Sequence, residues 1–284
     1  MKNNQKDKPS RVKRNPKNSP ERNPERNTED VFDMGSEKSS EKYRLFNNFF
    51  DNQLAMDCYS EIMSLPEDLY LKYNWDHEMS KWTFNRFEEH CPPAIRKALD
   101  YMNWEFVNIV DEFAWALTMP DHAFVWWWVH VMLKWGILRP HLDFNILPAT
   151  LNEELQWLRV CNLIVYLNPH RKHERGGSLE LDIGETITVQ PEFNTAVLFD
   201  TRDVYHWMNQ PYTGDLPRVS LAAYYYIQVP KWIIKPHSTV YKPLDNETPE
   251  QKKEREDRAK VDRYSNPSYQ SEFKRFYNVN GLEW

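Results

Sequence analysis

The sequence is poor in the residues that mark several classes of protein. Only three of its 284 residues are cysteine, Cys58, Cys91 and Cys161, an odd number without a metal-ligand spacing. Such usage argues against a disulfide framework and fits a reducing compartment. Only seven residues are glycine, and the chain has no Gly-rich phosphate loop, Gly-x-Ser-x-Gly elbow or Cys-x-x-Cys pair. These absences disfavour phosphate-loop, serine-hydrolase and dithiol chemistry.

Long apolar runs and an excess of positive charge are also absent. No stretch of about 18 apolar residues occurs, and the first residues are polar, unlike those of a signal peptide. The formal net charge is −6, which argues against a protein that coats nucleic acid. We therefore expect a cytoplasmic protein with neither a membrane nor a nucleic acid as its partner.

Composition divides the chain into three parts. Residues 1–30 hold nine Lys or Arg against five Asp or Glu, and residues 1–40 are rich in Asn, Pro and Ser. Such a segment buries too little apolar surface to offset its ordering entropy, so we expect a disordered basic leader over residues 1–40. A tether to an anionic partner is the alternative. Residues 41–245 are expected to form one domain, and residues 246–284 a charged C-terminal helix and a docking tail.

The C-terminal helix is expected over about residues 249–262. Thr248 is a good N-cap, Pro249 suits the first helical position, and Gln251 completes a capping box. The helix is polar on nearly all sides, so we expect a solvent-facing appendage or a homodimer contact. The apolar residues at the chain end suggest that the tail docks onto a surface; they are Phe273, Phe276, Tyr277, Leu282 and Trp284.

Two helices are expected early in the central domain. Asp51 is a good N-cap for a helix over about 52–64 that buries Leu54, Cys58, Ile62 and Met63. From Pro93, apolar residues recur at three- and four-residue steps and predict a longer amphipathic helix. These residues are Ile95, Leu99, Met102, Phe106, Val110, Phe113 and Leu117. The two helices would form a layer that backs a sheet, and the segment 70–90 between them has no clear period.

The second half of the domain is dominated by short, β-rich segments. We expect strands near 124–135, 140–146, 160–167, 178–182, 186–190, 195–200, 205–209 and 218–228. A succession of short strands without intervening helices favours a β-sandwich or jelly roll over a parallel α/β sheet. The predicted fold is therefore mostly β with flanking α, a double-stranded β-helix (jelly roll) supported by a helical layer.

The segment Pro-His-Leu-Asp-Phe-Asn at 140–145 carries the clearest chemical signal. Residues two apart on a strand point the same way, so His141 and Asp143 would project from one face. His206 lies 65 residues further on. Two histidines and one carboxylate form the facial triad of non-haem Fe(II) oxygenases. Alone, the His-x-Asp pair could also be a strand-end turn with a hydrogen-bonded histidine.

A basic residue follows this set of candidate ligands. Arg218 lies twelve residues after His206, and Ser220 would share its strand face. A carboxylate ligand needs a planar fork of donors, which arginine supplies and lysine does not. The hydroxyl of Ser220 adds a further donor.

Several neighbouring segments complete a family pattern. They are Val-Tyr-Leu-Asn-Pro at 165–169, Gly-Gly-Ser-Leu-Glu-Leu at 176–181, Ala-Val-Leu-Phe-Asp at 196–200 and Arg-Val-Ser at 218–220. With the candidate triad, they resemble the Fe(II)/2-oxoglutarate-dependent dioxygenase superfamily, in particular its prolyl-4-hydroxylase-like branch.

The resemblance implies a cofactor and a set of site residues. It implies Fe(II) as the metal, with 2-oxoglutarate and O2 as cosubstrates. The implied iron ligands are His141, Asp143 and His206. The implied contacts to 2-oxoglutarate are Arg218, Ser220, Tyr166 and Asn162, with Arg218 also counted among the catalytic residues. Strand parity would bring Tyr224 towards the metal side of the pocket.

The resemblance also implies an enzymatic activity, and the sequence leaves other functions possible. The implied enzyme hydroxylates an unactivated C–H bond of a small-molecule or peptidyl substrate and releases succinate and CO2. One alternative is a non-catalytic cupin-like protein that binds a metal or a small acid. Another is a scaffold whose basic leader is the functional part. The charged loop with His170 and His173 is either a solvated loop over the pocket mouth or a lid that favours an acidic substrate.

Overall fold

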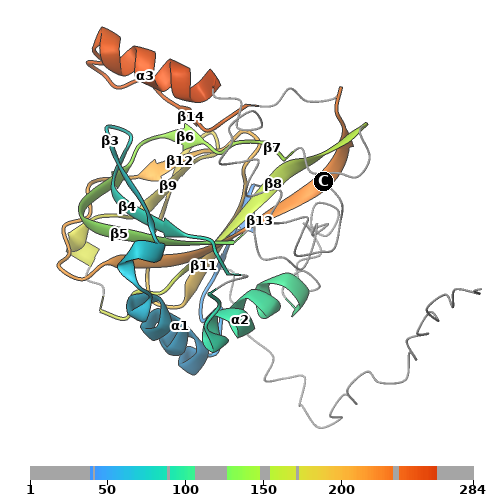
Figure 1. Ribbon diagram of the computed structural model, residues 1–284, viewed down its shortest axis with the longest axis vertical. Coiled ribbons are helices and arrows are strands. Elements are labelled where there is room, and N and C mark those ends of the chain that lie inside the picture. The colour runs from blue at the N-terminus through green and yellow to red at the C-terminus, as the bar shows by residue number, and fades with distance from the viewer. Residues whose placement is uncertain are drawn as a thin grey trace, which may run out of the picture. The chain divides into compact units, whose positions relative to one another are not determined.

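Two antiparallel sheets form the fold. The computed structural model describes residues 39–40, 42–87, 90–105, 127–147, 154–170, 173–232 and 237–260. The strands of the larger sheet are β1 (Ser39–Ser40), β2 (Tyr43–Phe46), β3 (Leu71–Trp75), β4 (Glu78–Phe84), β5 (Trp127–Leu138), β7 (Ile146–Leu147), β8 (Leu155–Tyr166), β11 (Thr195–Asp200) and β13 (Arg218–Pro230). Their order is β1-β2-β11-β8-β13-β5-β4-β3, with β7 paired to β8 (Figure 1).

The smaller sheet covers one face of the larger one. Its strands are β6 (His141–Leu142), β9 (Leu179–Asp182), β10 (Thr186–Val189), β12 (Tyr205–Met208) and β14 (Val240–Tyr241), in the order β10-β9-β12-β6-β14. A shared core joins the two sheets, in which Leu179 and Leu181 of β9 pack with Val197 and Phe199 of β11. Two antiparallel sheets packed in this way confirm the predicted jelly roll.

One expected strand is interrupted where the chain changes sheets. The strand predicted over 140–146 consists of β6 in the smaller sheet and β7 in the larger sheet. Residues 143–145 cross between them, and the carbonyl of Asn145 accepts a 2.7 Å hydrogen bond from the backbone of Arg159 in β8. The crossing places Asp143 beside both sheets.

Alternation along β13 separates a core face from a site face. Val219, Leu221, Ala223 and Tyr225 are buried in the main core, which also contains buried residues of the helices α1 (Asn52–Ser64) and α2 (Pro93–Asp100). Residues 218, 220, 222 and 224 point to the opposite side, towards the smaller sheet. The sheet therefore uses one face for stability and the other for the candidate site.

The helical layer agrees with the sequence analysis over most of its length. Helix α1 (Asn52–Ser64) begins at Asp51, whose carboxylate accepts hydrogen bonds from two backbone N–H groups of the first turn. It buries Leu54, Cys58 and Ile62 as predicted, whereas Met63 is 42% exposed and the prediction for this residue is wrong. Met63 follows Ile62 by about 100° around the helix and so leaves the buried stripe.

The second helix begins at Pro93 as expected and stays helical to the end of the described segment at Glu105. Helix α2 (Pro93–Asp100) continues as a π-helical turn over Tyr101–Glu105, and Ile95, Leu99 and Met102 are fully buried. The rest of the predicted stripe, from residue 106 on, lies outside the described residues, as do the leader up to residue 38 and the docking tail. Short 3₁₀ turns occur at Glu67–Leu69 and His173–Arg175.

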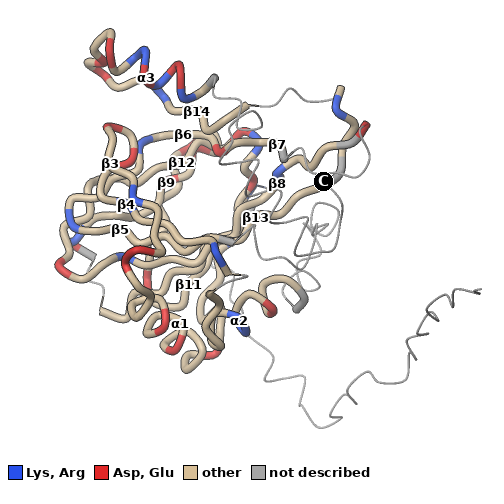
Figure 2. The backbone as a smooth tube through the Cα atoms, viewed as in Figure 1, with Lys and Arg blue, Asp and Glu red and all other residues tan. Residues whose placement is uncertain are grey.

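Helix α3 (Pro249–Lys260) lies beside β14 at the top of Figure 1. The predicted capping box is present: Gln251 Oε1 accepts from the Thr248 backbone at 2.8 Å, and Thr248 Oγ1 accepts from the Gln251 backbone at 3.2 Å. Acidic and basic residues are interleaved along the helix (Figure 2). The homodimer contact suggested for it stays a prediction.

The described helices include none with the length and apolar character needed to cross a membrane.

Candidate active site

Three candidate metal ligands meet between the two sheets. The ligand atoms of His141, Asp143 and His206 all lie within 4.8 Å of one another. His141 and His206 are directly paired across β6 and β12, and the centroids of their rings are 4.2 Å apart. Asp143 follows β6 at the crossing between the sheets. Over the described residues, this is the one group of three or more such side chains close enough to share a metal ion.

Backbone carbonyls orient both imidazole rings. Nδ1 of His141 lies 2.8 Å from the Arg139 carbonyl, and Nδ1 of His206 lies 3.3 Å from the Val204 carbonyl. Because a carbonyl only accepts, each Nδ1 carries the proton and each Nε2 keeps its lone pair. The Nε2 atoms lie 3.7 Å and 3.9 Å from the oxygens of Asp143. This is the tautomer that metal ligation through Nε2 requires.

Burial keeps both histidines neutral at neutral pH. It lowers the pKa of His141 to about 3, with the neighbouring His206 adding to the effect, and it also lowers the pKa of His206. Neutral imidazoles and an ionised carboxylate are the protonation states that bind a divalent metal. The donor set therefore fits Fe(II).

Arg159 holds the carboxylate of Asp143. Its Nη1 lies 3.0 Å from Asp143 Oδ2, and the side chain of Arg159 is 2% exposed. The guanidinium carbon lies 3.7 Å from the ring centroids of both Phe144 and Tyr224, and Tyr226 accepts hydrogen bonds of 3.2 and 3.0 Å from Nε and Nη2. Burial alone would raise the pKa of Asp143, but Arg159 and the two histidines hold it well below its usual range.

The predicted contacts to 2-oxoglutarate lie on the site face of the larger sheet. Arg218 is 7% exposed, and its guanidinium carbon lies 5.0 Å from the ring centroid of Tyr166. Ser220 is paired with Tyr166, and Tyr224 is paired with Asn162. Within the described residues Arg218 has no carboxylate partner, and neither its Nε nor the Oδ1 of Asn162 has a hydrogen-bond partner. A buried guanidinium in this state fits an anionic ligand.

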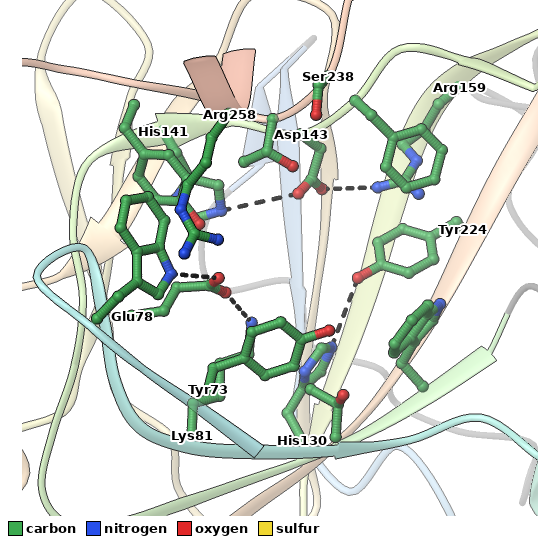
Figure 3. A pocket seen from close by; sticks show the side chains of 16 residues that line it. Tyr73, Glu78, Lys81, His130, His141, Asp143, Arg159, Tyr224, Ser238 and Arg258 are labelled. Carbon is green, nitrogen blue, oxygen red and sulfur yellow. Dashed lines mark hydrogen bonds and ion pairs between the residues drawn. The ribbon is translucent and has the colours of Figure 1, made fainter. Parts of the chain in front are cut away.

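A cavity of about 220 Å³ opens beside the triad. One side is formed by the β3–β4 hairpin, which contributes Tyr73, Trp75, Glu78, Lys81 and Thr83. The other walls come from β5, β8, β13, the segment 238–241 and Arg258 of α3 (Figure 3). The cavity reaches His141 and Asp143, so a bound molecule would lie next to the candidate metal position.

The sequence patterns did not predict that Arg159 and the β3–β4 hairpin belong to the site. Arg159 interrupts an apolar strand, which is a signal for a buried charge with a partner. Strand parity counted from Asn162 nevertheless assigns it to the core face. A register shift opposite Tyr225 and Tyr226 reverses that parity and brings Arg159 to the site. Tyr224 lines the same cavity as His141 and Asp143, stacks on Arg159 and lies 3.5 Å from His130 Nε2.

The Asp143–Arg159 pair generates a prediction about stability. Arg159→Met should lower the free energy of unfolding of the metal-free protein by about 3 kcal/mol, because it leaves a buried carboxylate without its cation. Because the pKa of Asp143 is depressed in the folded state, this stabilisation exists above the unfolded pKa of about 4 and is lost as the pH falls further. Urea unfolding at pH 7 and at lower pH measures both effects.

The matched control removes the charge from the other member of the pair. Asp143→Asn combined with Arg159→Met should recover part of the lost stability, because no buried charge is then left unpaired. Equal losses in the single and double variants, or a loss that does not change with pH, would show that the ion pair is not what stabilises this position.

This chain resembles one protein family and several solved structures of known proteins. Residues 127–226 match the family described as the 2OG-Fe(II) oxygenase superfamily. A prolyl-4-hydroxylase from Pseudomonas putida aligns with a TM-score of 0.50 and 16% identity over 65% of this chain and 91% of its own. No curated protein matches the chain significantly.

A second solved structure has a similar fold. It is a prolyl hydroxylase from Trichoplax adhaerens in complex with a peptide fragment of the hypoxia inducible factor oxygen degradation domain. It aligns with a TM-score of 0.52 and 14% identity over 66% of this chain and 84% of its own. At such identities the two structures establish the fold, and the family match supports an oxygenase with iron and 2-oxoglutarate as cofactor and cosubstrate. The resemblance stated from the sequence is thus confirmed: residues 127–226 carry the pattern of the 2OG-Fe(II) oxygenase superfamily, on the fold shared by its prolyl-4-hydroxylase-like members.

Proposed function

We propose that this chain is an Fe(II)- and 2-oxoglutarate-dependent hydroxylase of a small-molecule or peptidyl substrate. The observation that carries the proposal is the convergence of His141, Asp143 and His206 within 4.8 Å of one another, beside a cavity that His141 and Asp143 line. The reaction would combine substrate, 2-oxoglutarate and O2 to give hydroxylated substrate, succinate and CO2. The iron and its cosubstrates supply the oxidising power, while the protein binds, orients and excludes water.

The three triad residues would hold the metal through two Nε2 atoms and one carboxylate oxygen. The backbone carbonyls at Arg139 and Val204 would keep the lone pairs directed inward. Three protein ligands leave further positions on the metal for the cosubstrates, which is the property that distinguishes this triad from a closed structural site.

Arg218 would bind the distal carboxylate of 2-oxoglutarate. Its guanidinium is buried and without a carboxylate partner over the described residues, so an incoming carboxylate would satisfy an otherwise unpaired charge. Three polar residues share the sheet face of Arg218 or are paired with residues on that face: Ser220, Tyr166 and Asn162. They would supply the remaining polar contacts of the bound cosubstrate.

The experiment that tests the function is succinate release from 2-oxoglutarate in air. We expect the wild-type protein with Fe(II) to form succinate and His206→Ala to lose at least 99% of this activity, because one metal ligand is missing. His170→Ala is the matched control, since this histidine is exposed and lies outside the triad. Metal and 2-oxoglutarate binding without succinate formation would favour the non-catalytic binding protein.

Arg218 gives a second prediction that separates its role from that of the metal ligands. Arg218→Ala should raise the KM for 2-oxoglutarate by about tenfold or more, because a charge-assisted bidentate contact is lost, while Fe(II) binding stays close to wild type. Arg218→Lys keeps the charge without the planar fork, so its KM for 2-oxoglutarate should lie between those of the wild type and Arg218→Ala. An unchanged KM in both variants would remove Arg218 from the cosubstrate site.

A further inference from the structure

A row of polar side chains on β4 and β5 crosses the cavity wall. Thr83 of β4 is paired with His130 of β5, and Lys81 lies two residues from Thr83 on the same face of β4. All three side chains line the cavity beside His141 and Asp143 (Figure 3 labels Lys81 and His130). No part of the triad or of the predicted 2-oxoglutarate contacts uses them.

Lys81 is a buried cation with donors to spare. Its Nζ donates to Glu78 Oε1 at 2.8 Å, and its side chain is 12% exposed. The other carboxylate oxygen of Glu78 accepts from Trp75 Nε1 at 3.2 Å. Glu78 is thus engaged through both oxygens, whereas Glu78 is the one hydrogen-bond partner of Lys81 within the described residues. An ammonium group has three donors, so two remain for a ligand.

The two neighbours of Lys81 are also incompletely bonded. Thr83 is 2% exposed, and its Oγ1 has no hydrogen-bond partner over the described part of the chain. The same holds for the buried Nδ1 of His130. Buried polar atoms in native proteins are nearly always satisfied, so unpaired ones that line a cavity indicate a polar ligand.

The charges of the cavity wall do not oppose a ligand that is an anion. Three cations, Lys81, Arg159 and Arg258, face two carboxylates, Glu78 and Asp143, which leaves a formal excess of one positive charge in the wall. Fe(II) and the 2-oxoglutarate dianion would carry opposite charges of equal size and would not change this excess. Glu254 offsets Arg258 from the solvent side, where both side chains are 47% exposed and water screens their charges.

Lys81 is separate from the predicted carboxylate clamp, although His130 is directly paired with Ser220 of that clamp. Met132 of β5 is paired with Arg218 on one side and with Lys81 on the other, so two strand spacings lie between the two cations. Two spacings amount to roughly 10 Å. Lys81 and Arg218 therefore lie in different parts of the space between the sheets.

We propose that Lys81, together with Thr83 and His130, forms a binding site for a carboxylate of an acidic substrate. The inference rests on the proposed function, because it places the substrate in the cavity next to the triad. The carboxylate would accept from the two remaining donors of Lys81 and from Thr83. Trp128 and Tyr73 in the same wall would contact the apolar part of the molecule. Lys81 would fix which C–H bond lies nearest the metal.

The test is a binding titration on the anaerobic protein loaded with Fe(II) and 2-oxoglutarate. The probes are small carboxylic acids and N-acyl amino acids, and each acid is compared with its neutral primary amide. Calorimetry measures the affinity of each compound. At least one acid should bind about tenfold more tightly than its amide. Lys81→Met should remove this preference, and Thr83→Val, which keeps the shape and loses the hydroxyl, should weaken the acid about threefold.

Control variants separate the site from general effects of charge. Lys134→Met also removes a lysine paired with a carboxylate, here that of Asp215, but on the exposed surface, and should leave acid binding unchanged. The affinity of Lys81→Met for 2-oxoglutarate should stay within about twofold of wild type. If Lys81→Met folds poorly, Thr83→Val tests the site in its place, provided that its thermal stability equals that of the wild type.

Three outcomes would overturn the proposal. They are equal binding of acids and amides, an acid preference that survives in both Lys81→Met and Thr83→Val, and a large loss of 2-oxoglutarate affinity in Lys81→Met. The last would assign the row to the cosubstrate. Failure of the proposed function appears separately as absent Fe(II) or 2-oxoglutarate binding by the wild type, in which case the same titration on the metal-free protein still tests Lys81.

Discussion

The burial of the Asp143 carboxylate between two histidines and one arginine is the constraint on which the site depends. A carboxylate removed from water needs a cation close by, and Arg159 meets this need at 3.0 Å. Stacking between Phe144 and Tyr224 and bonding to Tyr226 fix the guanidinium, which in turn fixes the carboxylate. A preformed ligand set of this kind binds a metal without a large rearrangement of side chains.

The two-sheet architecture explains how distant segments supply that set. The chain leaves the smaller sheet after Leu142, passes Asp143 and joins the larger sheet at β7, so one short crossing contacts both layers. His206 returns on the neighbouring strand of the smaller sheet, while Arg159 and Arg218 come from the larger one. The helices pack on the far face of the larger sheet, which leaves its near face free for polar residues.

The features that could be predicted from the sequence are those that depend on short-range patterns of residues. Helix α1 and strand β11 have the predicted bounds, and the predicted ligands His141, Asp143 and His206 lie close enough to share a metal ion. The role of Arg218 stays a prediction. Arg159 could not be placed, because a bulge reverses strand parity and such a bulge has no local signature in these residues. The β3–β4 hairpin showed no period because it lies at a sheet edge, where most side chains are half-buried on both faces.

The most direct test of the metal and cosubstrate site is an anaerobic titration with Fe(II) and then 2-oxoglutarate, followed by visible absorption. If His141, Asp143 and His206 bind iron and Arg218 lies beside the bound cosubstrate, the wild-type protein should develop the weak charge-transfer band of an iron–2-oxoglutarate chelate. Asp143→Ala, shown to be folded by circular dichroism, should not develop it. A folded wild-type protein without the band, or an equal band in Asp143→Ala, would contradict the assignment of this site.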